Sequence, residues 1–211
     1  MRTRIKICGL TRAEDVRAAV EAGADAVGFV FAPSSRQVTL DDAARLAAAV
    51  PPPVARVGVF VDASFEEVES AVRVVGLTAV QLCGSETPEF CSGISVPVIK
   101  ASRVGTAFAW TALEPYRGQA AAQLLDTYVS GKMGGTSKTF AWNDIGESPG
   151  WASLFVAGGL TPSNVAEAVR AMRPFAVDVS SGVESAPGLK DPSLIAAFCA
   201  AVRAVDQEVY R

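Results

Sequence analysis

Eight short apolar runs recur along this chain of 211 residues, and they restrict its possible folds more than any other feature of the sequence. Most lack the alternation of polar and apolar residues that a half-exposed strand shows, and this is typical of parallel strands buried on both faces. We therefore expect strands at Ile5–Cys8, Ala26–Phe31, Ala55–Val61, Ala79–Leu82, Val96–Ala101, Gln123–Tyr128, Leu154–Ala157 and Phe175–Val179.

Between most of these runs lie segments whose apolar residues follow helical spacing. The expected helices are Ala13–Ala22, Leu40–Val50, Phe65–Val74, Val165–Met172 and Leu194–Val209. Several carry start signals. Thr11 with Glu14 and Ser64 with Glu67 have the spacing of a capping box. Two further pairs place a capping residue before a first-turn proline, namely Thr161–Pro162 and Asp191–Pro192.

About eight strand and helix units therefore alternate, and no linker or run of charge divides them. This pattern favours a single-domain (β/α)₈ TIM barrel over residues 1–211. Because half of the residues are hydrophobic, a chain of this length can bury the core of such a barrel. An open, doubly wound sheet would show the same periodicity, since periodicity does not report whether a sheet closes.

Charge and cysteine spacing limit the partners. A formal net charge of -3 provides no basic field for a polyphosphate backbone, so we expect no nucleic acid partner. The start, MRTRIKICGL, lacks the long apolar stretch of a secretion signal, and no run is long enough to span a bilayer. The four cysteines form no CxxC pair, which argues against a disulfide framework and a structural zinc site. We expect a cytoplasmic protein with neither a metal nor a membrane partner.

The chain contains no histidine. Triads of the Ser-His-Asp kind, histidine metal ligands and histidine general bases are therefore excluded. Proton transfer would have to use cysteine, carboxylate, lysine or tyrosine side chains.

Two such groups follow apolar runs, where the catalytic groups of a barrel gather. Cys8 ends the first run just before the helix expected near Thr11, and a helix amino terminus lowers the pKa of a thiol. The alternative is an inert buried cysteine.

Asp126 lies near the carboxyl end of the sixth run. Burial there would raise the pKa of its carboxyl and keep it protonated as a general acid. The alternative is a carboxylate that caps the following loop.

Two glycine-rich loops follow the seventh and eighth runs, the usual phosphate site of such barrels. Glycines let backbone amides approach an anion, and hydroxyl groups add donors. Each loop alone would also be explained as a tight turn. The candidate phosphate-binding residues are Gly158, Gly159, Ser180, Ser181 and Gly182.

Two further loops hold candidates. The segment 131–138, which includes Gly135, fails the P-loop pattern and is interpreted as a lid or a third phosphate-contacting segment, or else as a surface loop. Arg36, after the second run, could bind a carboxylate through two parallel hydrogen bonds, although a lone loop arginine is more often solvated.

With these positions assembled, the chain resembles the phosphoribosylanthranilate isomerase family over essentially its whole length. Many ordered matches carry the resemblance, and together they are highly specific. They are Lys6–Thr11, Val27–Phe31 continuing to Ser35 and Arg36, Val57–Val61, Leu124–Asp126, Gly134–Trp142, Ala157–Leu160 and Asp178–Glu184.

The resemblance implies an Amadori rearrangement, without a cofactor, of N-(5-phosphoribosyl)anthranilate to 1-(2-carboxyphenylamino)-1-deoxyribulose 5-phosphate in tryptophan biosynthesis. It implies that Asp126 is the acid that opens the furanose ring and that Cys8 is the base. Arg36 would bind the anthranilate carboxylate, Asp178 would lie near the substrate amine, and the glycine-rich loops would bind the phosphate. The partner would be a phosphorylated aminosugar, bound by a monomer or a homodimer.

One departure concerns the fourth run. Where relatives commonly read Gln-Leu-His-Gly, this chain reads Gln81-Leu82-Cys83-Gly84, which leaves any role of that histidine in doubt. Because Cys83 and Cys8 both end strands, a further hypothesis is that activity is sensitive to oxidation, provided that the two thiols lie close together. Other hypotheses are another sugar-phosphate barrel isomerase or epimerase, a bifunctional isomerase that also serves histidine biosynthesis, and a phosphate-binding barrel without catalysis.

Overall fold

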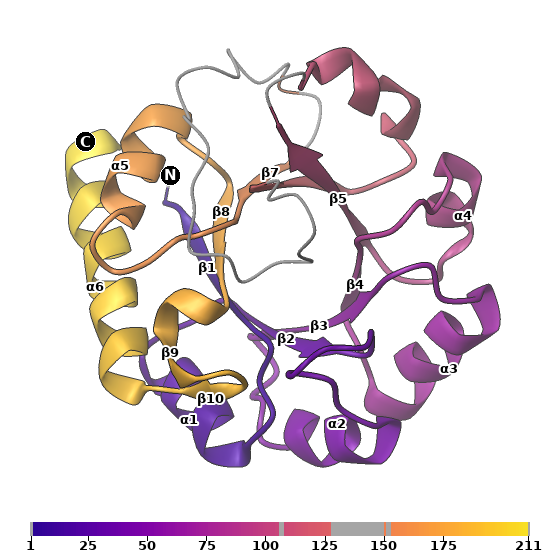
Figure 1. The fold of residues 1–211 in the computed structure, drawn as a ribbon, viewed down its shortest axis with the longest axis horizontal. Coiled ribbons are helices and arrows are strands. Elements are labelled where there is room, and N and C mark those ends of the chain that lie inside the picture. The colour runs from indigo at the N-terminus through magenta and orange to yellow at the C-terminus, as the bar shows by residue number, and fades with distance from the viewer. Residues whose placement is uncertain (1, 106–107, 128–149, 151–152, 211) are drawn as a thin grey trace.

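Eight parallel strands close into a barrel in the computed structural model, which describes residues 2–105, 108–127, 150 and 153–210. Their order around the barrel is the order of the chain, from β1 to β8 (Figure 1). The strands are β1 Arg4–Cys8, β2 Ala26–Val30, β3 Ala55–Phe60, β4 Ala79–Leu82, β5 Val98–Val104, β6 Ala122–Thr127, β7 Ser153–Val156 and β8 Ala176–Val179.

Closure takes place where β1 meets β8. In β1, Lys6 pairs with Ala26 of β2 on one side and with Asp178 of β8 on the other, both in parallel register. No edge strand is left in the barrel, so the open doubly wound sheet is excluded and the predicted (β/α)₈ barrel is confirmed.

Helices surround the barrel (Figure 1). The five expected helices are present within a few residues of their predicted bounds, whereas the helix between β4 and β5 was not predicted. A 3-10 helix, η1 Trp110–Tyr116, follows β5. The α-helices are α1 Ala13–Glu21, α2 Leu40–Ala47, α3 Phe65–Val75, α4 Pro88–Gly93, α5 Val165–Met172 and α6 Pro192–Val209. None of those in the described ranges is long and apolar enough to cross a membrane.

A short hairpin interrupts the alternation after β8. It follows a 3-10 turn, η3 Ser181–Val183, and consists of β9 Glu184–Ala186 and β10 Leu189–Lys190, which pair antiparallel. The fifth strand also differs from its prediction of Val96–Ala101. It begins after Pro97, which has no N–H to donate, and continues to Val104 because it pairs with β6 over this length.

Two of the four start signals are confirmed. Ser64 and Glu67 form a reciprocal capping box, and Asp191 accepts hydrogen bonds from the first amides of α6. The signal at Thr11 is wrong, because Arg12 is the N-cap and the Thr11 hydroxyl donates to the Gly188 carbonyl at 2.7 Å.

The signal at Thr161–Pro162 is also wrong. These residues lie in a turn, and α5 begins only at Val165. The Asn164 amide oxygen accepts from the Thr161 N–H at 2.8 Å and therefore stabilises the turn before the helix.

The core has two layers. An outer layer packs the strands against the helices, and an inner cluster consists of strand residues and their immediate extension, among them Val57, Leu124 and Phe155. The described polar residues that are buried include Lys6, Gln81, Lys100, Gln123 and Asp178, all on strands. Polar groups thus line part of the barrel, and this is where a site can form.

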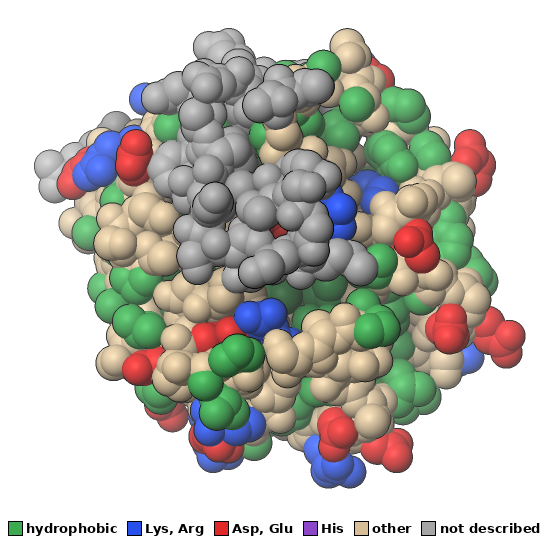
Figure 2. Space-filling model, viewed as in Figure 1, with side chains coloured by type: hydrophobic (Ala, Val, Ile, Leu, Met, Phe, Trp, Pro, Cys, Tyr) green, Lys and Arg blue, Asp and Glu red, His purple; other side chains and the backbone are tan. Residues whose placement is uncertain are grey.

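Charged side chains of both signs lie on the surface. On the face seen in Figure 2, the coloured positive and negative side chains are interspersed and lie mostly around the rim. Among the described residues visible there, no broad basic patch offers a surface for a polyphosphate backbone.

Substitution of Phe198 tests how much the packing of the outer layer contributes to stability. This α6 side chain is fully buried, so Phe198→Ala is expected to lower the free energy of unfolding by about 3 to 5 kcal/mol through lost burial and a residual cavity. Val74→Ala, at a helix position that is 52% exposed, should change it by less than about 0.5 kcal/mol. Urea unfolding of both variants measures the difference. Equal losses would contradict the packing described.

Candidate active site

A cavity of about 440 Å³ opens at the carboxyl ends of the barrel strands. Every predicted site residue in the described ranges lines it, whereas Gly135 lies outside those ranges. The lining residues with a predicted role are Cys8, Arg36, Asp126, Gly158, Gly159, Asp178, Ser180, Ser181 and Gly182.

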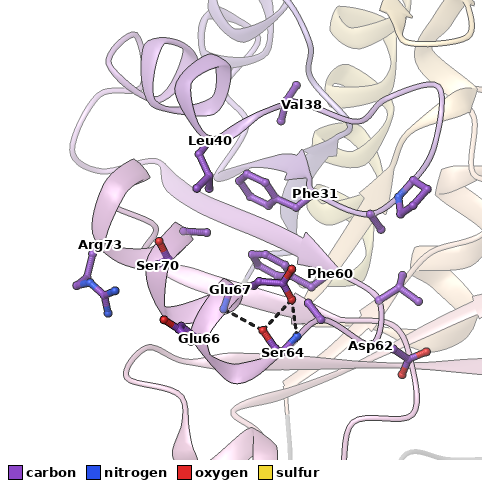
Figure 3. Close-up of a pocket in the computed structure, with 15 residues that line it drawn as sticks. Phe31, Val38, Leu40, Phe60, Asp62, Ser64, Glu66, Glu67, Ser70 and Arg73 are labelled. Atoms are coloured by element: carbon purple, nitrogen blue, oxygen red, sulfur yellow. Dashed lines mark hydrogen bonds between the residues drawn. The ribbon is translucent and has the colours of Figure 1, made fainter.

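A larger cavity, of about 670 Å³, lies between α2 and α3 (Figure 3). Its floor includes Phe31 and Phe60, whose rings stack with centroids 4.9 Å apart. At its rim, Ser64 and Glu67 bond to one another in the capping box. None of the predicted site residues in the described ranges lines it, so its size does not make it the site.

A buried ion pair crosses the seam of the barrel beside the smaller cavity. Lys6 lies opposite Asp178 in the strand register, and its Nζ is 2.8 Å from Asp178 Oδ2. Burial alone would lower the pKa of Lys6, but the charges of Asp178 and Cys8 outweigh burial, so the pKa is raised. Lys6 is therefore a fixed cation beneath the site.

Cys8 ends β1 and is buried in the cavity wall. The predicted lowering of its pKa is wrong. Burial raises the pKa of the thiol, and the Lys6 ammonium only partly opposes this. The helix α1 begins only at Ala13, so its amino terminus does not govern the thiol. Room for the sulfur comes from Gly28, where a Cβ would lie 2.8 Å from Cys8 Sγ.

Asp126 approaches the cavity from the end of β6, opposite Arg103 of β5 in the register. Its side chain is half-buried. The barrel thus places the thiol of β1 and the carboxyl of β6 in the wall of one cavity, which the spacing along the chain could not show.

The two glycine-rich loops meet on the same side of the cavity. Gly158 and Gly159 both adopt positive φ angles, of 84° and 66°. A Cβ at Gly182 would lie only 1.8 Å from the Leu160 carbonyl oxygen, so the backbones of the two loops touch. This contact requires glycine and brings two sets of backbone groups together, as an anion site needs.

Arg36 is held rather than solvated. Its Nε and Nη2 each donate to Glu184, at 2.7 Å to Oε1 and 2.7 Å to Oε2. The stem of the side chain passes over Gly9, where a Cβ would lie 2.5 Å from Arg36 Cδ. One edge of the guanidinium, formed by Nε and Nη2, therefore already binds a carboxylate, that of Glu184.

Four charged residues at the site received no individual role in the sequence analysis. Arg103 lines the cavity, and Lys6, Glu184 and Lys190 lie beside it. A signal existed for Lys6, because a lysine within a buried apolar run needs a counterion. Glu184 and Lys190 gave no local signal, since they meet each other only when the hairpin forms and the other partner of Glu184, Arg36, is 148 positions away. Within the described ranges, no cluster of histidine, cysteine and carboxylate groups could hold a metal ion.

Comparisons with known proteins agree with this geometry. A family model for N-(5'phosphoribosyl)anthranilate (PRA) isomerase matches residues 5–201. The chain belongs to this family. An N-(5'-phosphoribosyl)anthranilate isomerase from Symbiobacterium thermophilum is 48% identical over 95% of this chain and 98% of its own length. One from Methylibium petroleiphilum is 47% identical over 99% of this chain and 98% of its own length.

Solved phosphoribosylanthranilate isomerases share the fold. The structure from Thermotoga maritima has a TM-score of 0.83 and 42% identity, over 96% of this chain and 99% of that one. Another, in complex with reduced 1-(o-carboxyphenylamino)-1-deoxyribulose 5-phosphate, has a TM-score of 0.80 and 40% identity over the same shares. The resemblance inferred from the motifs is confirmed, and the chain is an isomerase of tryptophan biosynthesis.

Cys83 lines the same cavity as Cys8. It accepts a hydrogen bond from Gln81 Nε2 at 3.3 Å, and burial raises its pKa to about 12. The thiolate, which is the form that reacts with oxidants and alkylating agents, is therefore scarce at neutral pH. Proximity to Cys8 alone does not make this thiol reactive.

Iodoacetamide labelling tests the raised pKa of Cys83. At pH 8 its thiolate fraction should be far below that of an ordinary thiol, and alkylation should be on the order of 40-fold slower after allowing for the greater nucleophilicity of a more basic thiolate. Because the folded pKa is about 12, the rate should still rise about tenfold per pH unit between pH 8 and 10. Mass spectrometry of the labelled peptide gives the rate, with Cys83→Ser as control. A plateau by pH 9 would contradict the assignment.

Proposed function

We propose that this chain rearranges N-(5'-phosphoribosyl)anthranilate to 1-(o-carboxyphenylamino)-1-deoxyribulose 5-phosphate, with Asp126 as general acid and Cys8 as general base. One observation carries the proposal. In a member of this family, both residues line a single cavity together with two glycine-rich loops and an arginine. An acid, a base and two places for anions are what an isomerase of a phosphorylated, carboxylated aminosugar needs.

The reaction begins with a proton from Asp126 to the furanose ring oxygen. The bond between this oxygen and the anomeric carbon breaks, and the nitrogen lone pair forms the Schiff base. The Cys8 thiolate then removes the proton from the adjacent sugar carbon, and the electron pair of that bond makes an enolamine. Tautomerisation of the enolamine gives the ketone, so atoms and electrons balance without a cofactor.

The two proton-transfer groups have to begin in opposite states, one protonated and the other ionised. Burial raises the pKa of Cys8 and so disfavours its thiolate, while the Lys6 ammonium favours it. Lys6 therefore assists the proposed base, because it lowers the free energy needed to form the Cys8 thiolate.

The remaining residues bind the ends of the substrate. Arg36 takes the anthranilate carboxylate, and Gly158, Gly159 and the segment 180–182 take the phosphate, with Gly135 as a further contact from outside the described ranges. Asp178 accepts the substrate N–H. Its Oδ1 is buried and accepts no hydrogen bond from any described residue, so it is available for this donor.

We further propose that residues 1–211 form one catalytic domain that acts in the cytoplasm without cofactor, metal, nucleic acid or membrane. The active unit is a monomer or a homodimer. Both states are named for a solved relative, the dimeric enzyme of Thermotoga maritima and the monomers generated from it.

Cys8→Ser and Asp126→Asn test the acid and base pair. Each should lower kcat by at least about a hundredfold, because general acid and base groups contribute that much. Binding of reduced 1-(o-carboxyphenylamino)-1-deoxyribulose 5-phosphate should remain in both. Turnover of freshly generated substrate is followed by fluorescence and binding by calorimetry. Substantial turnover by either variant would remove that residue from its role.

The wild-type enzyme serves as the reference for the rival hypotheses. Phosphate binding without turnover by the wild type would favour a silent barrel instead. Turnover of the aminoaldose of histidine biosynthesis would favour the bifunctional isomerase.

Gly182→Ala tests the phosphate site. A Cβ there would meet the Leu160 carbonyl oxygen at 1.8 Å and push the two loops apart. Affinity for the product analogue should fall on the order of ten- to a hundredfold, as expected when binding groups move by about 1 Å. Gly118→Ala is the control, because Gly118 has a φ of +75° but no neighbour within 4 Å of an added Cβ. Gly118→Ala should lower the free energy of unfolding without changing the affinity for the product analogue. Calorimetry compares the affinities of the two variants. Unchanged affinity in Gly182→Ala would place the phosphate elsewhere.

A further inference from the structure

Arg36 presents two edges that can each hold a carboxylate, because the planar guanidinium carries five N–H donors in a rigid fork. One edge consists of Nε and Nη2. Both nitrogens donate to the Glu184 carboxylate, each at 2.7 Å. The other edge consists of Nη1 and the second hydrogen of Nη2. No described residue accepts a hydrogen bond from Nη1, and Arg36 lines the cavity.

Glu184 is itself held by a second cation. Lys190 Nζ donates to Glu184 Oε1 at 2.8 Å, and its side chain is fully buried. The carboxylate of Glu184 is only 5% exposed. Burial alone would raise its pKa, but the hydrogen bonds from Arg36 and Lys190 outweigh burial and lower it, so the group stays ionised. Two cations around one anion leave one positive charge beside the cavity.

Lys190 also reaches the loop after β8. Its ammonium donates to the Ser180 carbonyl at 3.0 Å and to the Ser180 hydroxyl at 3.3 Å. Ser180 lines the cavity next to the glycine of the proposed phosphate site. One buried lysine therefore connects the residue that holds Arg36 with the loop proposed to bind phosphate.

The hairpin of β9 and β10 fixes these contacts. Its Gly188 carbonyl accepts from the Thr11 hydroxyl at 2.7 Å, and a Cβ on Gly188 would lie 2.7 Å from the Ser35 carbonyl oxygen. The Lys190 N–H donates to Asp15 at 3.2 Å. The hairpin thus packs against the loops after β1 and β2, and Arg36 lies in the second of these.

We propose that Glu184, held in place by Lys190, is a positioning residue that orients Arg36 so that its Nη1 and Nη2 edge faces the carboxylate of the substrate. The pair thereby determines specificity for substrates that carry this carboxylate. The inference rests on the proposed function, because it assumes that Arg36 binds the anthranilate end. Glu184 touches no reacting atom and acts only through Arg36.

The test compares two ligands that differ in one group. One is reduced 1-(o-carboxyphenylamino)-1-deoxyribulose 5-phosphate, and the other is its phenylamino counterpart without the carboxyl. Calorimetry measures both against wild type, Glu184→Gln, Arg36→Met and the double variant. Glu208→Gln is the matched control, because it breaks an exposed ion pair in which Arg170 also donates through Nε and Nη2.

Glu184→Gln should lower the affinity for the carboxylated ligand about tenfold and leave the affinity for the other ligand unchanged, because only the orientation of Arg36 is lost. In the Arg36→Met background the same substitution should have no further effect, since residues that act as a unit are not additive. In turnover assays KM should rise more than kcat falls, which is the mark of an interaction made equally in ground and transition states.

Three results would overturn the inference. In the first, Glu184→Gln lowers the affinity for both ligands equally. In the second, the losses of binding free energy in the double variant are additive. In the third, Arg36→Met abolishes the preference for the carboxylated ligand but Glu184→Gln does not change it. If Arg36→Met itself leaves that preference intact, the proposed role of Arg36 fails first. Should Glu184→Gln not fold, Glu184→Asp keeps the negative charge beside Lys190 but shortens the side chain that orients Arg36, and gives the same comparison.

Discussion

The ion pair between Lys6 and Asp178 joins the first strand of the barrel to the last, and the site is arranged around it. The two residues are 172 positions apart, yet Nζ and Oδ2 lie 2.8 Å apart and both side chains are buried. Loss of one partner would leave an unpaired charge inside the barrel, which costs about 3 to 5 kcal/mol. The pair is complete only when β1 and β8 are side by side. Closure of the barrel and assembly of the site are therefore one event.

Within the same pair, Lys6 favours the Cys8 thiolate that the proposed mechanism requires, whereas Asp178 disfavours it. Burial raises the pKa of Cys8, and Lys6 opposes this. Arg36 and Lys190 surround Glu184 in a second cluster at the cavity. The two clusters hold three cations, Lys6, Arg36 and Lys190, against two carboxylates, and the Cys8 thiolate that the proposed mechanism requires would balance the third cation. A chain with a net charge of -3 thus gathers three cations beside one cavity.

Much of the fold and part of the site could be predicted from local patterns. Buried strands and amphipathic helices repeat over a few residues, and the ends of strands indicated Cys8 and Asp126. The pattern failed at Thr11, whose hydroxyl bonds to Gly188, 177 positions away, instead of capping α1. It failed again for the pKa of Cys8, because burial depends on the whole barrel and not on the nearest helix.

The sequence by itself determined the order and type of the elements, the absence of histidine chemistry and the motifs that indicate the family, because these depend on neighbouring residues along the chain. Only the tertiary structure decided that the sheet closes and that Glu184 occupies one edge of Arg36, 148 positions away. Such contacts have no local signature, since each partner alone looks like an ordinary charged residue of a loop. Their geometry exists only once parallel strands have brought distant loops to one end of the barrel.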